Sequence, residues 1–150
     1  MIIDGFLQFD PAGTAITAGG PSTNTIDLGS GRDLGIGDDA LQVVVHILET
    51  FAAAGAATLD VQVQSSVDNV TWTTLVESGA IPVADLVAGK SVLRTALPLD
   101  QPAVTAGIGR YLRLNYVVAT GPMTAGQVQA AVVIDRQANV AYPPGVTVSN

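Results

Sequence analysis

Hydrophobic and polar residues alternate most clearly in residues 110–118. Successive side chains of a β-strand point to opposite faces of its sheet, so this alternation predicts a strand with one apolar face and one partly hydrated face. Such a strand needs antiparallel neighbours and a second layer over its apolar side. The apolar face comprises Leu112, Leu114, Tyr116 and Val118, and the opposite face carries Arg113 and Asn115.

The same pattern recurs in short segments separated by turn signals. We expect residues 71–76 to pair with 59–64 across a turn at Asp68-Asn69, and the last segment to pair beside residues 110–118. Roughly eight strands without a convincing helix predict an all-β fold, an antiparallel β-sandwich of the jelly-roll or immunoglobulin-like type. No Cys…Trp…Cys pattern supports the immunoglobulin-like fold, so the jelly roll is favoured. The further segments are 25–28, 41–50, 91–97 and 127–135, with a short strand near Ile2-Ile3.

The two ends of the chain lack a clear period. Glycines and Pro21 interrupt residues 1–23, which we interpret as an extended N-terminal arm that folds back on its own domain or reaches across a neighbour. Residues 138–150 contain Tyr142-Pro143-Pro144, and these prolines cannot donate to a strand ladder. The expected organisation is therefore a single jelly-roll domain over residues 1–150, with an N-terminal arm (1–23) and a C-terminal arm (138–150).

Residues 41–50 differ from the other strands because apolar side chains occupy both of their faces. Val43, Val45 and Ile47 fall on one side, whereas Val44 and Leu48 fall on the other. Two interpretations follow: the strand is covered on both faces within its own domain, or one face meets another subunit.

Composition and charge exclude several classes of function. Only 13% of the residues are charged and the net charge is −7, whereas about a quarter of an average protein is charged. Phosphate recognition needs clustered basic residues, and the densest pair is Arg110 and Arg113, so we expect no nucleic-acid binding. No apolar run reaches the ~20 residues of a membrane-spanning helix, and the N-terminal residues do not resemble a signal peptide, so no membrane association is expected.

Candidate chemical sites are weak. His46 is the only histidine, and its place inside a strand favours a structural or interface role. The pair Asp38-Asp39 lies in a glycine-rich loop without the oxygen array that hard cations need. Residues 66–72 form a hairpin whose Trp72 we expect to pack into the core. We therefore predict no catalytic, cofactor-binding or metal-binding residues, no cofactor and no enzyme activity.

Five stretches, in this order and spacing, resemble the capsid cement (decoration) proteins of tailed bacteriophages. Their order carries the resemblance, because each stretch alone is weakly specific. The resemblance extends from the first residues to Tyr142-Pro143. The stretches are Thr25-Ile26-Asp27-Leu28-Gly29, Arg32 to Gly37, Ala53 to Leu59, Arg110 to Tyr116, and Thr120 to Gly126.

The resemblance implies a structural virion protein, made in the bacterial host cytoplasm and bound to the outer surface of a shell of HK97-type major capsid protein. That capsid protein and further copies of the chain would be its partners, with a dimer favoured over a trimer. Two alternatives stay open: a β-sandwich module that binds carbohydrate or another host-surface group, and a glycan-hydrolysing enzyme. With one Trp, three Tyr and three Phe, exposed aromatic side chains for sugar binding are scarce, and the few titratable groups argue against the enzyme.

Overall fold

The computed structural model describes residues 3–30, 41–97 and 108–134, most of which lie in β-strands. Two single-turn 3-10 helices, η1 and η2, are the helical elements of these ranges. The elements are η1 (Gly5–Leu7), β1 (Gln8–Ala15), β2 (Gly20–Pro21), β3 (Ile26–Asp27), β4 (Gln42–Ala53), β5 (Thr58–Ser66), β6 (Thr73–Glu77), β7 (Ile81–Pro82), η2 (Val83–Asp85), β8 (Ser91–Ala96), β9 (Tyr111–Ala119) and β10 (Met123–Val133).

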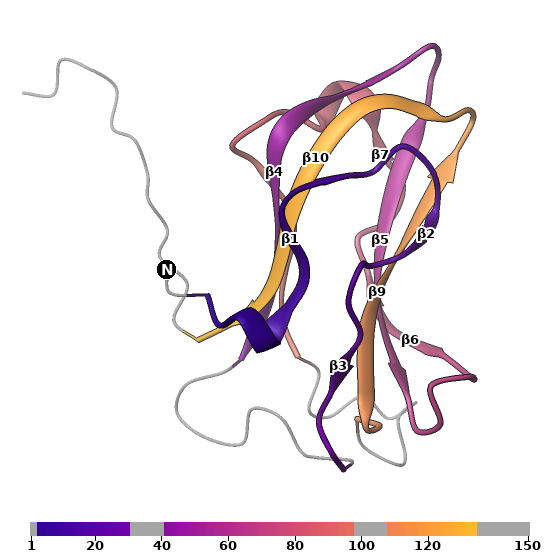
Figure 1. Ribbon diagram of the computed structural model, residues 1–150. Helices are drawn as coiled ribbons and strands as arrows, with labels where there is room; N and C mark the ends of the chain where they lie inside the picture. The colour runs from indigo at the N-terminus through magenta and orange to yellow at the C-terminus, as the bar shows by residue number, and fades with distance from the viewer. Residues whose placement is uncertain (1–2, 31–40, 98–107, 135–150) are drawn as a thin grey trace, which may run out of the picture.

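Two antiparallel sheets face each other (Figure 1). Sheet A has the strand order β1-β10-β4-β8; sheet B has the order β2-β9-β5-β6, with β3 also paired to β9 and β7 to β5. Early strands pair with late ones: β1 pairs with β10, β2 and β3 pair with β9, and β4 pairs with β8. The innermost pair is β5 with β6. This pairing of a long hairpin rolled into two layers is the jelly roll, so the predicted fold class is confirmed.

The alternating segments form the core as predicted. Leu112 and Leu114 of β9 are fully buried, and Tyr116 is 2% exposed. They belong to one apolar cluster with inward-facing residues of β4, β5 and β10. Those residues are Val43, Val45, Ile47, Leu59, Val61, Val63, Val128, Ala130 and Val132.

The expected pairing of the last strand beside residues 110–118 is wrong. β10 pairs with β1 and β4, whereas β9 pairs with β2, β3 and β5. The turn at Thr120 and Gly121, both with positive φ, carries the chain from sheet B to sheet A. Alternation shows which face of a strand is buried, but it does not identify the neighbouring strand.

The described part of the predicted N-terminal arm, residues 3–23, folds back on its own domain, which is one of the two interpretations of this stretch, and it contains a strand that was not expected. Residues 8–15 form β1, an edge strand of sheet A, and Phe9 is fully buried in the core. The ladder between β1 and β10 contains two register shifts, which disrupt the period of two in the sequence. No strand begins at Ile3. The predicted C-terminal arm, 138–150, lies outside the described residues.

Candidate interaction surfaces

A buried carboxylate attaches residues 16–23 to the sandwich. Asp10 is fully buried, and its Oδ1 accepts hydrogen bonds from the backbone N and the Oγ1 of Thr23, each at 2.8 Å. Its Oδ2 accepts one from the Tyr116 hydroxyl at 2.6 Å. Burial, followed by the nearby Asp10 charge, raises the pKa of Tyr116 above its ordinary value, so the hydroxyl keeps its proton and remains a donor.

These contacts border a hollow of about 260 Å³ lined by Asp10, Tyr116 and residues 14–21. Both oxygens of Asp10 already accept hydrogen bonds from the protein. Asp10 therefore suits a structural role, connecting β1 to Thr23 after β2 and to Tyr116 of β9, better than a role in acid–base chemistry.

The outer face of sheet A is apolar at its centre. Val44 of β4 lies beside Ala131 and Val133 of β10, and Ile3 packs against all three. Val44 is only 1% exposed, so the second apolar face of residues 41–50 is covered within the chain at this position. Leu48, on the same face, is 44% exposed and leaves part of the strand open.

His46 lies next to this apolar centre, opposite Gln129 of β10. Its Nδ1 is 2.8 Å from the Ser91 Oγ. Partial burial, and then the charge of Arg94, lower the pKa of His46, which favours the neutral ring at neutral pH. No acidic side chain completes a triad with this pair in the part of the chain that the structure describes.

The outer face of sheet B carries a connected row of polar side chains. Arg113 of β9 donates from Nε to the Gln64 Oε1 at 2.9 Å, and Gln64 Nε2 donates to the Gln62 Oε1 at 3.4 Å. Gln62 also accepts a hydrogen bond from Asn115 at 3.1 Å and donates to the Asp60 Oδ2 at 3.2 Å. Each side chain is thereby held by a neighbour, along β5 or across from β9 to β5.

Trp72 lies at the end of this polar row. The expectation that Trp72 packs into the core is wrong: its ring is half-buried, and the Arg113 guanidinium carbon lies 4.0 Å from its centroid. Arg113 is on the face opposite Leu112 and Leu114, so Trp72 covers the outer face of sheet B. It falls just before β6, where strand alternation does not set the direction of a side chain.

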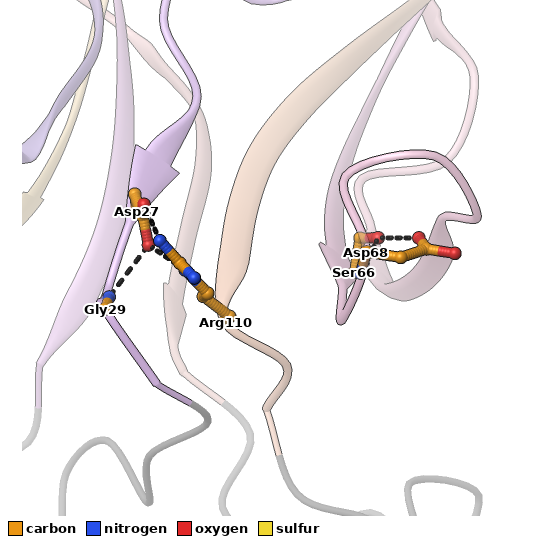
Figure 2. A network of polar contacts seen from close by, with 5 residues as sticks. All are labelled: Asp27, Gly29, Ser66, Asp68 and Arg110. Atoms are coloured by element: carbon orange, nitrogen blue, oxygen red, sulfur yellow. Dashed lines mark hydrogen bonds and ion pairs between the residues drawn. The ribbon is translucent and has the colours of Figure 1, made fainter.

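The hairpin between β5 and β6 is held by Asp68. The Oδ1 of Asp68 accepts hydrogen bonds from the Ser66 hydroxyl, from Val70 N and from Thr71 N at 2.8–2.9 Å, and Figure 2 shows the contact with Ser66. These bonds, with the two backbone amides contributing most, lower the pKa of Asp68 to about 2. Asn69 adopts a positive φ of 59°, so the predicted turn is confirmed.

An exposed ion pair fixes the start of β9. The Nε and Nη2 of Arg110 each donate to one carboxylate oxygen of Asp27 at 2.7 Å, and Asp27 Oδ1 also accepts from Gly29 N (Figure 2). The Arg110 hydrogen bonds, followed by that of Gly29, lower the pKa of Asp27 to about 2. Two of the resembling stretches, 25–29 and 110–116, therefore meet here.

Two further stretches of the resemblance also meet in space. Residues 54–57 connect β4 to β5 and residues 120–122 connect β9 to β10, and Thr58 pairs with Ala119 directly below them. Met123 pairs with Ala53 on the other side. Residues 32–37, the remaining stretch, lie outside the described residues, as does the Asp38-Asp39 pair.

Sequence reasoning missed the most organised polar groups. Asp10 lies in a stretch without a clear period, and the Trp72–Arg113 pair joins a hairpin loop to a strand that is distant in the sequence. The described residues contain no group of three or more His, Cys, Asp or Glu side chains that could hold a metal ion. No helix in these ranges is long and apolar enough to cross a membrane.

A family match covers most of the chain. The model of the family described as Bbp16 matches residues 11–132. This segment begins in the middle of β1 and ends at the penultimate residue of β10, so it includes all the strands between them. None of the curated proteins with which the chain was compared matches it. Because the matched segment covers most of the 150 residues, the chain belongs to the Bbp16 family.

Proposed function

We propose that the protein is a capsid cement (decoration) protein that binds the outer surface of an HK97-type tailed-phage shell and stabilises the joints between capsomers. The observation that carries this proposal is the ordered set of five stretches that resembles such proteins. Within the described residues these stretches meet in two pairs, 25–29 with 110–116 at the start of β9 and 53–59 with 120–126 at its end.

The composition of the surface supports a role in assembly. A protein that binds only the assembled shell adds its binding free energy to the stability of that shell. Few charged residues and a net charge of −7 suit a subunit that lies flat on protein neighbours and away from packaged DNA. The role requires no catalysis, cofactor or metal ion.

In this proposal the protein acts as a symmetric homo-oligomer, with a dimer favoured over a trimer. Joints between capsomers lie on symmetry axes, and a symmetric subunit matches them. The outer face of sheet A is the surface on which two copies would meet, because it exposes Leu48 beside the apolar centre at Val44.

The test compares particles assembled with and without the protein. Shells that lack it are expected to assemble but to release their DNA at a lower temperature, which a dye that reports free DNA measures during heating. Adding the purified protein back to deficient particles should restore the higher temperature. Equal release temperatures with and without the protein would remove the cement function, even if the protein were found on the shell.

A further inference from the structure

The lower part of the outer face of sheet B, around Trp72 and Arg113, is built like the energetic centre of a protein interface. Tryptophan and arginine are among the residues most enriched at such centres. Here Trp72 comes from the loop before β6 and Arg113 from β9, the guanidinium lies over the ring, and Gln64 accepts a hydrogen bond from Arg113 Nε. The ring and the guanidinium are thus held in place before any partner arrives, which lowers the entropy cost of binding.

Arg113 retains unused hydrogen-bonding capacity. Its Nε is engaged by Gln64, whereas its two terminal nitrogens donate to no group within residues 3–30, 41–97 and 108–134. The ion pair recorded in these ranges is that of Arg110 with Asp27, so Arg113 has no carboxylate partner there. A fixed guanidinium fork of this kind matches the two oxygens of a carboxylate.

Exposed apolar side chains lie on the β5–β6 hairpin, in the same connecting loop as Trp72. Val67 and Val70 are 72% and 79% exposed. Ser66, which precedes Val67, and Thr71, which follows Val70, both donate hydrogen bonds to Asp68. The loop of the hairpin is therefore ordered by hydrogen bonds, and it exposes the side chains of Val67 and Val70 to solvent. Isolated exposed valines are common, but these two share one short, hydrogen-bonded loop with Trp72.

We propose that Trp72, Arg113, Val67 and Val70 form the surface through which the protein docks onto its shell, where they receive a segment of the capsid protein that presents a carboxylate next to apolar side chains. This inference rests on the proposed cement function and names the contact surface for it. Charge complementarity selects the partner: Arg113 is one of only six basic residues in the chain, and its guanidinium has no carboxylate partner within the described residues.

The experiment measures how much of the protein co-sediments with shells that lack it, across a range of concentrations. Arg113→Ala and the double variant Val67→Ser/Val70→Ser are each expected to raise the dissociation constant at least tenfold. Lys90→Ala removes one positive charge at an exposed turn before β8 and should bind like the wild type. Far-ultraviolet circular dichroism and the thermal midpoint establish that each variant is folded.

The outcomes separate this inference from the function on which it rests. Wild-type protein that never sediments with shells would remove the cement function itself. Wild-type binding that Arg113→Ala and the valine double variant both retain would overturn the docking surface and leave the cement function standing. An acidic polysaccharide, polygalacturonate, serves as a second probe: binding that Arg113→Ala abolishes, with shell affinity unchanged, would overturn the protein-docking assignment in favour of a glycan site.

Discussion

At the scale of single residues, glycine is required where another backbone lies too close for a side chain. Gly109 precedes β9, and a Cβ at this position would collide with the backbone carbonyl of Ser66. Its N–H also donates to the Ser65 Oγ at 2.8 Å, so the close approach is part of the packing of β9 on β5. Gly20 is a matched contrast, because a Cβ there meets nothing within 4 Å.

Gly109→Ala is therefore expected to destabilise the fold by roughly 1–3 kcal/mol, the usual cost of forcing extra atoms into a packed site. Gly20→Ala should change the free energy of unfolding by no more than about 0.5 kcal/mol, as at most surface positions. Urea unfolding followed by circular dichroism gives both values. Equal stabilities of the two variants would show that β9 can move away from Ser66 without cost.

Two exposed carboxylates, those of Asp27 and Asp68, make the stability of the fold depend on pH in the acid range. Asp27 and Asp68 have folded-state pKa values of about 2, below the ordinary value of 3.8. A lowered carboxylate pKa means that the folded state binds fewer protons than the unfolded state, so the stabilisation is complete above pH 3.8 and is lost as the pH falls towards 2. Asp68→Asn retains an acceptor oxygen for the turn but cannot titrate.

The wild-type thermal midpoint is accordingly expected to fall between pH 4 and pH 2, and that of Asp68→Asn to fall less steeply over the same interval. Differential scanning calorimetry at half-unit steps of pH measures the two slopes. Parallel slopes would mean that Asp68 contributes nothing to acid sensitivity.

At the scale of elements, β1 decides whether the N-terminal region belongs to the fold. Phe6 and Phe9 provide a direct comparison, because they are the same residue type three positions apart. Phe6 in η1 is 91% exposed, whereas Phe9 in β1 is fully buried. An extended arm would leave both side chains equally dispensable.

Phe9→Ala should lower the free energy of unfolding by roughly 3–5 kcal/mol, which is typical of an aromatic side chain removed from a core. Phe6→Ala should leave it almost unchanged. Guanidinium unfolding curves provide the measurement. A small effect of Phe9→Ala would favour the other interpretation, an arm that reaches across a neighbour.

The elements that could be predicted from the sequence are those with uninterrupted alternation. β5, β9 and much of β10 were expected close to their observed positions because their apolar residues recur at every second position, and β4 because apolar residues occupy both of its faces. β1 was missed because Pro11, Gly13 and two register shifts interrupt its pattern. The neighbours of β10 and the outward position of Trp72 depend on contacts between distant segments, which a local period does not encode.

At the scale of the whole molecule, the two sheets expose outer faces of different character. Sheet A has an apolar centre with Leu48 partly open, and sheet B has a polar row ending at Trp72. A specific dimer interface buries on the order of 1,200–2,000 Å² in total. Because Leu48 is 44% exposed next to a centre that is covered within the chain, the outer face of sheet A is the better candidate for contact between copies, and the polar face of sheet B remains available for the shell.

Leu48→Asp is therefore expected to weaken self-association at least tenfold, because a carboxylate would be desolvated at the contact. Val117→Asp is the matched control, since Val117 is 39% exposed on sheet B. Sedimentation-velocity ultracentrifugation over a range of concentrations measures the effect. Weakened association of Val117→Asp instead would assign the dimer contact to sheet B.

The pairing of early strands with late ones has a consequence during synthesis on the ribosome. β10 lies between β1 and β4, and β9 lies between β2 and β5, so each sheet lacks an inner strand until residues 111–133 have left the exit tunnel. Until then the nascent chain carries the apolar residues of β4 and β5 without their final neighbours. Contacts of this sequence separation form slowly, and exposed strands of this kind are prone to aggregate. The yield of folded protein should thus depend on chaperones that hold the nascent chain until its last strands emerge.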